Sequence, residues 1–320
     1  MPRVILALAG GVGAARMLRG LVAAAPGADI TAVVNTGDDT VVHGLHVSPD
    51  LDTVTYTLAG AINPDTGWGL AGETWHALEE LRSYAGGRLA WFALGDRDLG
   101  THLYRTARLA EGAPLSEISA EIAARWELPV RLLPMSDDRV ATRVVLAADG
   151  AEIGFQEYFV GRRHSVAVAA IRLAGIDEAR PGPGVLAAIA SASRVVICPS
   201  NPLLSIAPVL ATPGIGDAVV ARRPDTVAVS PIIAGRAVKG PADRLLAELG
   251  HEASVVGVAR LWAPYASVLV VDTADAGLAG AVEAEGMTCV VTPTVMSGPP
   301  EAAALARVVL GGGEGTGPWR

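Results

Sequence analysis

The sequence predicts a doubly wound α/β fold with a mostly parallel sheet, and the order of its apolar segments is the main reason. Short runs rich in Val and Ile alternate with segments of helical period rich in Ala, Leu, Glu and Arg, which is the pattern of repeated βα units. Of the 320 residues, 51% are hydrophobic, 18% are charged and only 4% are aromatic, a composition that suits helices packed closely on a buried sheet. The length predicts one large Rossmann-like domain with an appended lobe rather than three domains.

The strands and helices of this fold can be placed in order along the chain. Apolar runs predict strands at residues 4–8, 30–34, 89–94, 130–133, 194–198, 226–229, 267–271 and 288–291. Helical periodicity predicts helices at residues 14–24, 74–84, 100–109, 115–126, 185–192, 242–249 and 278–285. Strands and helices therefore alternate along most of the chain.

One segment departs from this alternation. Residues 143–147 and 152–160 flank the dipeptide Asp149-Gly150, which is typical of an antiparallel hairpin. We therefore expect a small inserted α+β lobe over residues 135–180, which ends at the Pro-Gly-Pro-Gly sequence of residues 181–184. Residues 1–134 and 181–310 then form the Rossmann-like core, and the glycine-rich residues 311–320 form a loose tail.

The charge and the cysteine content exclude several classes of protein. A net charge of -8 and a pI near 5.3 argue against nucleic acid or an anionic membrane as the main partner, so an anionic ligand must be held by local groups. Cys198 and Cys289 lie far apart in apolar runs without metal-ligand spacing, which predicts buried, reduced thiols. The apolar run at residues 4–9 is too short for a signal peptide and no run reaches transmembrane length, so we expect a cytoplasmic protein.

The first predicted strand ends in a glycine loop that leads directly into the first predicted helix. Gly10, Gly11 and Gly13 would let the main chain approach a phosphate closely, and the helix N-terminus adds unpaired N–H groups with a partial positive charge. A tight turn without a ligand is the alternative, but the first βα connection is where open α/β sheets place their ligand crevice. Arg16 stands where the dinucleotide fingerprint wants a small residue, and no Gly-Lys-Ser/Thr follows, so neither a nicotinamide site nor an ordinary P-loop is expected.

Three acidic pairs lie at or after predicted strand ends, at residues 38 and 39, 50 and 52, and 96 and 98. Two carboxylates about 4 Å apart repel by about 4 kcal/mol at an effective dielectric constant of about 20, so their clustering favours a bound cation or a raised pKa. Mg²⁺ takes one or two carboxylates plus phosphate oxygens, which predicts a magnesium site beside the glycine loop. Helix capping is the alternative: Asp50 and Asp52 could cap a helix that begins at Thr53, and for Asp98 we expect a cap of the helix that begins at Gly100.

The second half of the chain contributes polar and basic residues after two further strands. Asn201 and Ser205 follow the strand predicted at residues 194–198 and would face the crevice, where an amide can pair with a purine edge; an Asx turn and a serine cap explain them equally well. Arg236 and Lys239 lie in a glycine-bearing loop after the strand predicted at residues 226–229. In an acidic protein they indicate a local anion pocket, with surface solvation as the alternative.

Eight motifs in order resemble one known family. They are AGGVG at residues 9–13, VNTGDD at 34–39, SPDLDTV at 48–54, GWGL at 67–70, LGDRD at 94–98, LPMSDD at 133–138, PSNP at 199–202 and KGP at 239–241. Together, and at similar separations, they closely resemble the 2-phospho-L-lactate transferase family (CofD/FbiA) over nearly the whole chain.

The resemblance implies an enzyme of coenzyme F420 biosynthesis. Members of the family join the deazariboflavin Fo to the phosphorylated three-carbon acid of a guanosine diphosphate ester, with Mg²⁺ as cofactor. The terminal ribityl hydroxyl of Fo attacks the phosphorus that bears the acid, and GMP leaves. The composition rich in Ala and Arg favours the actinobacterial branch, in which a phosphoenolpyruvyl donor gives dehydro-F420-0, whereas a phospholactyl donor gives F420-0. The family also implies a homodimer.

The resemblance also assigns residues. Asp52 matches the family's Fo-contacting aspartate and is expected to bind metal or position the hydroxyl, with Asp50 as the second catalytic candidate. The resemblance implies these further roles: metal ligation by Asp38 and Asp50, contacts to the diphosphate by Gly10, Gly11 and Gly13, nucleotide contacts by Asn201 and Ser205, and charge balance by Lys239. Ala93 stands where some members carry a basic residue, so Arg97 is the candidate to replace that contact with Fo.

A related group within the same family offers the nearest alternative function. These CofD-like proteins bind UDP-sugars and act as regulatory modules, and they look similar at the glycine loop. The stretch at residues 50–54 resembles the transferase pattern, which favours the enzyme. A nicotinamide oxidoreductase is the more distant alternative.

Overall fold

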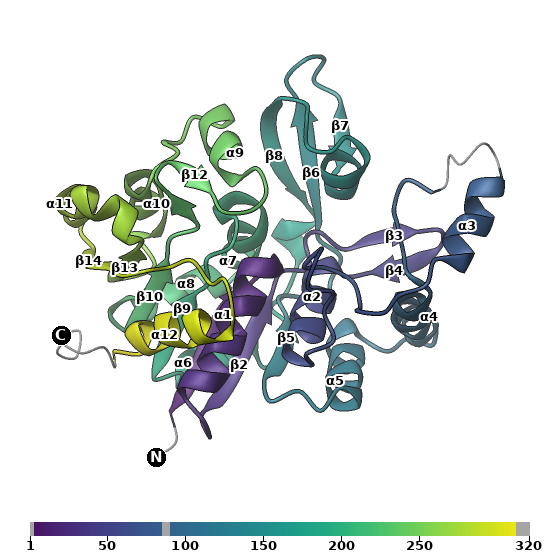
Figure 1. Cartoon of the computed structure of the whole chain (residues 1–320), viewed down its shortest axis with the longest axis horizontal. Coiled ribbons are helices and arrows are strands. Elements are labelled where there is room, and N and C mark those ends of the chain that lie inside the picture. The colour runs from purple at the N-terminus through teal and green to yellow at the C-terminus, as the bar shows by residue number, and fades with distance from the viewer. Residues whose placement is uncertain (1–2, 85–89, 312–320) are drawn as a thin grey trace.

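A seven-stranded parallel sheet forms the centre of the computed structural model, which describes residues 3–84 and 90–311 (Figure 1). The strands lie in the order β14 (Thr288–Val291), β13 (Val268–Val271), β10 (Thr226–Val229), β9 (Arg194–Ile197), β1 (Val4–Ala9), β2 (Asp29–Val34) and β5 (Arg131–Pro134). Every neighbouring pair is parallel. The α/β class and seven of the predicted strands are therefore confirmed.

Helices cover both faces of this sheet because successive residues of each buried strand face opposite sides. In β1, Ile5 and Ala7 pack in one apolar cluster, and Leu6 and Leu8 pack in the other. The first face is covered by α1 (Gly11–Ala24), α2 (Pro49–Leu58), α5 (Leu115–Arg125) and α12 (Pro299–Val309). The second face is covered by α6 (Val185–Ser191), α7 (Ala207–Ala211), α8 (Ile215–Ala221), α9 (Ala242–Glu248), α10 (Val255–Trp262) and α11 (Ala279–Ala284). The sheet is thus doubly wound.

Two glycines of α1 allow unusually close packing around the first strand. A Cβ at Gly13 would lie 2.1 Å from the carbonyl oxygen of Pro199, and a Cβ at Gly20 would lie 2.3 Å from that of Ala302. The first approach joins α1 to the loop after β9, and the second packs α1 against α12, which lies beside it in Figure 1.

The chain reverses its direction across the sheet between β1 and β9. It runs outward from β1 through β2 to β5, then returns to β9 beside β1 and continues to β14 at the other edge. The loops after β1 and β9 therefore diverge at their carboxyl ends. Such a switch point is where open α/β sheets form a ligand crevice.

Smaller elements surround the carboxyl end of the sheet. An antiparallel sheet of β7 (Glu152–Gly154), β6 (Ala141–Leu146) and β8 (Val168–Ala174) forms the upper lobe in Figure 1. Two hairpins, β3 (Thr40–Val42) with β4 (Leu45–Val47) and β11 (Ile232–Ile233) with β12 (Arg236–Ala237), were not predicted. Helices α3 (His76–Ser83) and α4 (Asp96–Ala110) lie beyond β3 and β4. Short π-helical turns span Glu157–Gly161 and Pro202–Ile206, and 3₁₀ turns span Ile176–Glu178, Arg223–Asp225 and Thr273–Leu278.

Two predicted strands need correction. The hairpin around Asp149-Gly150 is confirmed, but its second strand ends at Gly154 because Phe155 and Tyr158 turn into a helical segment and join the apolar core of the lobe. Of the strand predicted at 89–94, residue 89 lies outside the described residues, and residues 90–94 form turn and loop. Leu94 is buried against Val42 and Val47 of the β3–β4 hairpin, so this apolar run packs on a hairpin instead of joining the sheet.

Three further predictions concern the C-terminal tail, membrane spans and the two cysteines. The loose tail expected at 311–320 lies outside the described residues except for Gly311. Among described residues, no single helix has the length and hydropathy of a membrane span; one pair, Pro202–Ala211 with Ile215–Ala221, reaches them together but is bent by 93°. Cys198 is buried and Cys289 is partly buried, and both are free thiols, as expected.

Candidate active site

A cavity of about 500 Å³ lies where the chain reverses across the sheet. Its wall combines the glycine loop after β1, the acidic residues after β2 and in α2, the loop after β9, and the loop after β10. Phe155 and Phe159 of the upper lobe complete it. The cavity is lined by the following residues predicted for the site: Gly10, Gly11, Gly13, Asp38, Asp50, Asp52, Asn201, Ser205 and Lys239.

The glycine loop forms the start of α1 and part of the cavity floor. Gly10 is extended, and Gly11 has φ of +68°, a left-handed conformation that favours glycine. The Ser200 hydroxyl donates to the Gly10 carbonyl over 2.7 Å, which ties the loop after β9 to this loop. The N-terminal N–H groups of a 14-residue helix therefore open onto the cavity, as an anion site requires.

Asp38 and Asp50 are buried close to this loop, and the pKa of each carboxyl group is raised. Asn35 Nδ2 donates to Asp50 Oδ2 over 2.9 Å, while Asn35 Oδ1 accepts from the Gly37 amide. Burial raises the pKa of Asp50 to about 6, although the hydrogen bonds from Asn35 and Gly11 oppose the shift. Burial raises the pKa of Asp38 well above its usual range, and the charge of Asp50 adds to that effect. These two carboxyl groups are close enough to repel each other.

This pair fits a hard cation. Asp38 Oδ1 is buried and receives no hydrogen bond from any described residue, so it has a free acceptor oxygen inside the protein. A divalent ion would relieve the repulsion and satisfy that oxygen. Among the described residues no three acidic, histidine or cysteine side chains gather as a complete ligand set, so such an ion would also need ligands from substrate or water.

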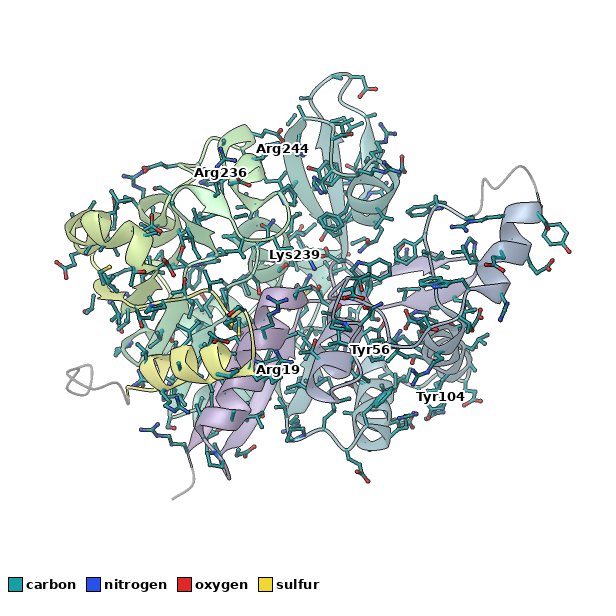
Figure 2. All side chains as sticks on the ribbon, viewed as in Figure 1. Arg19, Tyr56, Tyr104, Arg236, Lys239 and Arg244 are labelled. Atoms are coloured by element: carbon teal, nitrogen blue, oxygen red, sulfur yellow. The ribbon has the colours of Figure 1, made fainter. Side chains whose placement is uncertain are left out.

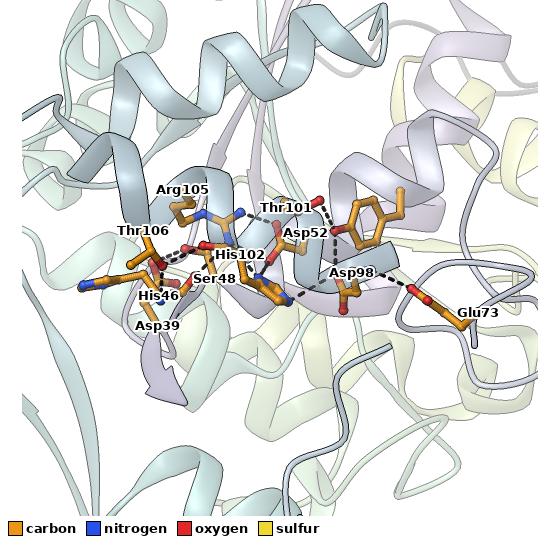
Figure 3. A network of polar contacts seen from close by, with 11 residues as sticks. Asp39, His46, Ser48, Asp52, Glu73, Asp98, Thr101, His102, Arg105 and Thr106 are labelled. Atoms are coloured by element: carbon orange, nitrogen blue, oxygen red, sulfur yellow. Dashed lines mark hydrogen bonds and ion pairs between the residues drawn. The ribbon is translucent and has the colours of Figure 1, made fainter. Parts of the chain in front are cut away.

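Asp52, by contrast, is paired with Arg105 from α4. Figure 3 shows the guanidinium facing the carboxylate: Nη1 donates to Oδ2 over 3.1 Å, and Nη2 donates to Oδ1. Both side chains are buried, at 8% and 2% exposure. Burial disfavours the charged guanidinium, but Asp52 outweighs this and raises the pKa of Arg105. Because both oxygens of Asp52 already accept charged hydrogen bonds, Asp52 fits a metal ion less well than Asp38 and Asp50 do.

Asp98 and His102 of α4 continue this network into the cavity wall. The Tyr56 hydroxyl of α2 donates to Asp98 Oδ1 over 2.6 Å, and His102 Nε2 lies 3.3 Å from the same oxygen. The expectation that Asp98 caps α4 is wrong. Glu73 caps this helix instead, because its carboxylate accepts from the backbone amides of Arg97 and Asp98. The side chain of Asp98 is thereby free to point into the network in Figure 3.

The capping alternative is also wrong for Asp50 and Asp52. Helix α2 begins at Pro49, earlier than expected, so both aspartates lie inside its first turn and neither makes a capping hydrogen bond. Both side chains still lie in the first turn of α2, at the positive end of its dipole.

The residues predicted from the second half differ in what their side chains do. Asn201 Oδ1 caps the following helical turn by accepting from the Leu203 and Leu204 amides, which leaves Nδ2 for the cavity. Lys239 Nζ donates to the carbonyl oxygen of Thr66 over 2.7 Å. Figure 2 shows Lys239 near the middle of the molecule, whereas Arg236 lies near the edge with β12 and does not line the cavity. Arg97 also stays outside the cavity, because its Nη1 donates to the carbonyl oxygen of Ala71.

Sequence reasoning missed an aromatic wall and one cation, Arg16. All three phenylalanines of the chain line the cavity, and Trp68 and Trp91 line it while remaining 46% and 43% exposed. The scarcity of aromatic residues, only 4% of the chain, was the available signal. Arg16 also lines the cavity. Burial lowers the pKa of Lys239, and the charge of Arg16 lowers it further, so these two cations lie near each other.

Comparisons with known proteins agree with one another. The sequence model of the family described as 2-phospho-L-lactate transferase CofD matches residues 5–292. A phosphoenolpyruvate transferase of Streptomyces griseus subsp. griseus is 49% identical over 312 residues, which cover 96% of this chain and 97% of that protein. A phosphoenolpyruvate transferase of Mycolicibacterium smegmatis is 41% identical over 319 residues, which cover 96% of this chain and 97% of that protein.

A solved structure shares the fold. The crystal structure of protein BH3568 from Bacillus halodurans superposes with a TM-score of 0.63 at 19% identity, covering 97% of this chain and 100% of that one. The near full-length match to the family and to its curated members says more about function than the shared fold does, because a doubly wound sheet serves many functions. The chain therefore belongs to the 2-phospho-L-lactate transferase family CofD.

Proposed function

We propose that this enzyme transfers a phosphoenolpyruvyl group from its guanosine diphosphate ester to the terminal ribityl hydroxyl of Fo. The hydroxyl oxygen forms a new bond to the phosphorus that bears the acid, the bond from that phosphorus to the GMP oxygen breaks, and the hydroxyl proton is released. The products are GMP and dehydro-F420-0. The relatives named phosphoenolpyruvate transferases favour this donor over the phospholactyl ester, which would give F420-0.

One observation supports the proposal most strongly: a single cavity combines a helix N-terminus for phosphate with an aromatic wall for a flat ring. The diphosphate would contact the amides of Gly10, Gly11 and Gly13, with Arg16 and Lys239 balancing its charge. The deazaflavin ring would stack against the aromatic wall of Trp91, Phe155 and Phe159. Positioning and charge neutralisation supply most of the catalysis of phosphoryl transfer, so no covalent intermediate with the protein is needed.

The nucleotide end of the donor would lie toward the loop after β9. Asn201 Nδ2 is a hydrogen-bond donor for which guanine O6 is a suitable acceptor, and the Asn201 cap fixes the orientation of the amide. Ser205 lies against Gly10, where an added Cβ would be 2.7 Å from Ser205 Cβ, so its hydroxyl is close to the proposed phosphate position.

Asp38 and Asp50 would hold Mg²⁺, which when bound neutralises charge on the diphosphate. The free Oδ1 of Asp38 and the raised pKa of Asp50 support this assignment. Asp52, which lines the cavity and is held by its ion pair with Arg105, would instead help to position the acceptor hydroxyl. By resemblance to the family we also infer a homodimer in the cytoplasm.

The test is incubation of the purified chain with Fo, Mg²⁺ and the phosphoenolpyruvyl ester of guanosine diphosphate, followed by chromatography of nucleotides. We expect GMP release only when Fo and donor are both present, and its loss when EDTA is added. GMP release without Fo, or binding of a UDP-sugar with no turnover of either guanosine ester, would contradict the transferase and favour a regulatory module.

A further inference from the structure

The proposed reaction needs a group that takes the proton of the attacking hydroxyl, and most acidic groups of the cavity are already committed. Asp38 and Asp50 carry the proposed cation. Both oxygens of Asp52 accept from Arg105. A proton acceptor must therefore be sought elsewhere along the cavity wall.

His102 is packed between Arg105 and Asp98. Its Nδ1 lies 3.3 Å from Arg105 Nη1, on the side of the ring that faces the Asp52–Arg105 pair. Its Nε2 lies 3.3 Å from Asp98 Oδ1, a contact without hydrogen-bond geometry to any described residue. With 1% of its side chain exposed, His102 serves to orient Asp98 rather than to meet substrate.

Asp98 has one oxygen held and one oxygen available. Oδ1 accepts from the Tyr56 hydroxyl at 2.6 Å and contacts His102. No described residue donates to Oδ2, and the side chain lines the cavity with 13% exposed. The backbone amide of Asp98 donates to Glu73 Oε1 over 2.8 Å, which fixes the first turn of α4. A carboxylate is thus held rigidly with a free acceptor oxygen at the cavity.

The charges around Asp98 keep it ionised. Burial would raise the pKa of Asp98, but the contacts from His102 and Tyr56 and the charge of Arg105 outweigh burial and hold this pKa below its usual range. Tyr56 cannot compete for the negative charge, because burial and the neighbouring Asp52 and Asp98 raise its own pKa. Asp98 is the opposite of Asp38 and Asp50, whose pKa values are raised.

We propose that Asp98 accepts the proton of the attacking hydroxyl through Oδ2, while Tyr56 and His102 hold Oδ1. This proposal rests on the transferase function proposed above. As the oxygen–phosphorus bond forms and the bond to GMP breaks, the hydroxyl proton passes to Asp98 and then to water, so the step balances. An aspartate with a low pKa suits this reaction, because the acceptor loses its proton late in a loose phosphoryl-transfer transition state; protein kinases use an aspartate in the same way.

The test compares Asp98→Asn with Asp96→Asn, the same change two residues earlier in α4. Asparagine still offers an acceptor oxygen to Tyr56 but cannot take a proton. Asp96 does not line the cavity; it accepts from the amides of His76 and Ala77 at the start of α3. We expect Asp98→Asn to lower kcat with Fo by about 10²-fold or more, with KM for the guanosine donor unchanged, and Asp96→Asn to keep kcat within about threefold.

A second variant separates proton transfer from a structural role. In Asp98→Ala, added formate should restore turnover in proportion to its concentration, because it supplies the missing carboxylate. Retention of wild-type kcat in either Asp98 variant would overturn the proposal. The proposal would also fail if the Asp98→Ala variant lost donor binding as well as activity and formate restored no turnover. A wild-type chain that releases no GMP would instead refute the transferase function itself, so the two failures are distinguishable.

Discussion

Replacing Gly13 with alanine tests the close approach that builds the phosphate site. The added Cβ would lie 2.1 Å from the carbonyl oxygen of Pro199, which is a backbone atom in the loop after β9 and cannot rotate away as a side chain could. Relieving the overlap requires a shift of about 1.4 Å between α1 and the loop after β9, since non-bonded atoms need about 3.5 Å. Overpacking of this kind costs about 1–3 kcal/mol, and we expect the upper part of that range.

Gly100→Ala is the matched control for this substitution. Gly100 also lies inside a long helix, α4, but no atom lies within 4 Å of its added Cβ. Alanine there should stabilise the protein by about 0.5–1 kcal/mol through helix propensity. Urea unfolding measures both values, and KM for the guanosine donor should rise in the Gly13 variant alone. Equal stability of the two variants would refute the close-packing argument.

Three further predictions follow from the charges of the site. Arg105→Met leaves Asp52 buried without its partner and should lower the free energy of unfolding in urea by about 3–5 kcal/mol. The double variant with Asp52→Asn should recover part of that loss. A loss below about 1 kcal/mol in the single variant would contradict the buried pair. Asp50 has a folded pKa near 6, above its unfolded value, so its contribution to stability falls as pH rises from 4 through 6, by up to roughly 3 kcal/mol. Asp50→Asn should therefore be more stable than wild type at pH 8 without metal and less stabilised by Mg²⁺; lower stability at pH 8 in metal-free urea unfolding would argue against this. Lys239→Gln should raise KM for the donor about tenfold or more, because a charged hydrogen bond to phosphate is lost, while KM for Fo stays constant. An unchanged donor KM in steady-state kinetics would remove Lys239 from the phosphate site.

The sheet was predictable because its strands are buried on both faces and therefore appear as continuous apolar runs. The same logic produced the incorrect strand at 89–94, since Trp91, Phe92 and Leu94 make an equally apolar run. These side chains pack on a hairpin and around a cavity, and neither partner can be recognised from a local pattern. The β3–β4 hairpin itself has three residues in each strand, too few for alternation to be visible.

The phosphate half of the site was predictable for a different reason. Gly10, Gly11, Asp38 and Asp50 lie in the loops after strands β1 and β2 or begin the next helix, so sheet topology brings them together. Arg105 was not predictable, because it pairs with an aspartate 53 positions away and the helix around it shows an ordinary surface pattern.

The role of Asp98 was misjudged because a carboxylate at a helix start is usually a cap. Here Glu73, 25 residues earlier, supplies that cap from a loop. Only the three-dimensional structure shows that the cap is already filled and that Asp98 has a different partner, Tyr56.

The most direct test of the central claim is the mass of the deazaflavin product when both donor esters are offered together. With Fo, Mg²⁺ and equal concentrations of the phosphoenolpyruvyl and phospholactyl esters of guanosine diphosphate, we expect one new anionic product with the mass of Fo plus a phosphoenolpyruvyl group and one GMP for each molecule formed. A product carrying the phospholactyl group would contradict the donor assignment, and unmodified Fo with no GMP would contradict the account as a whole.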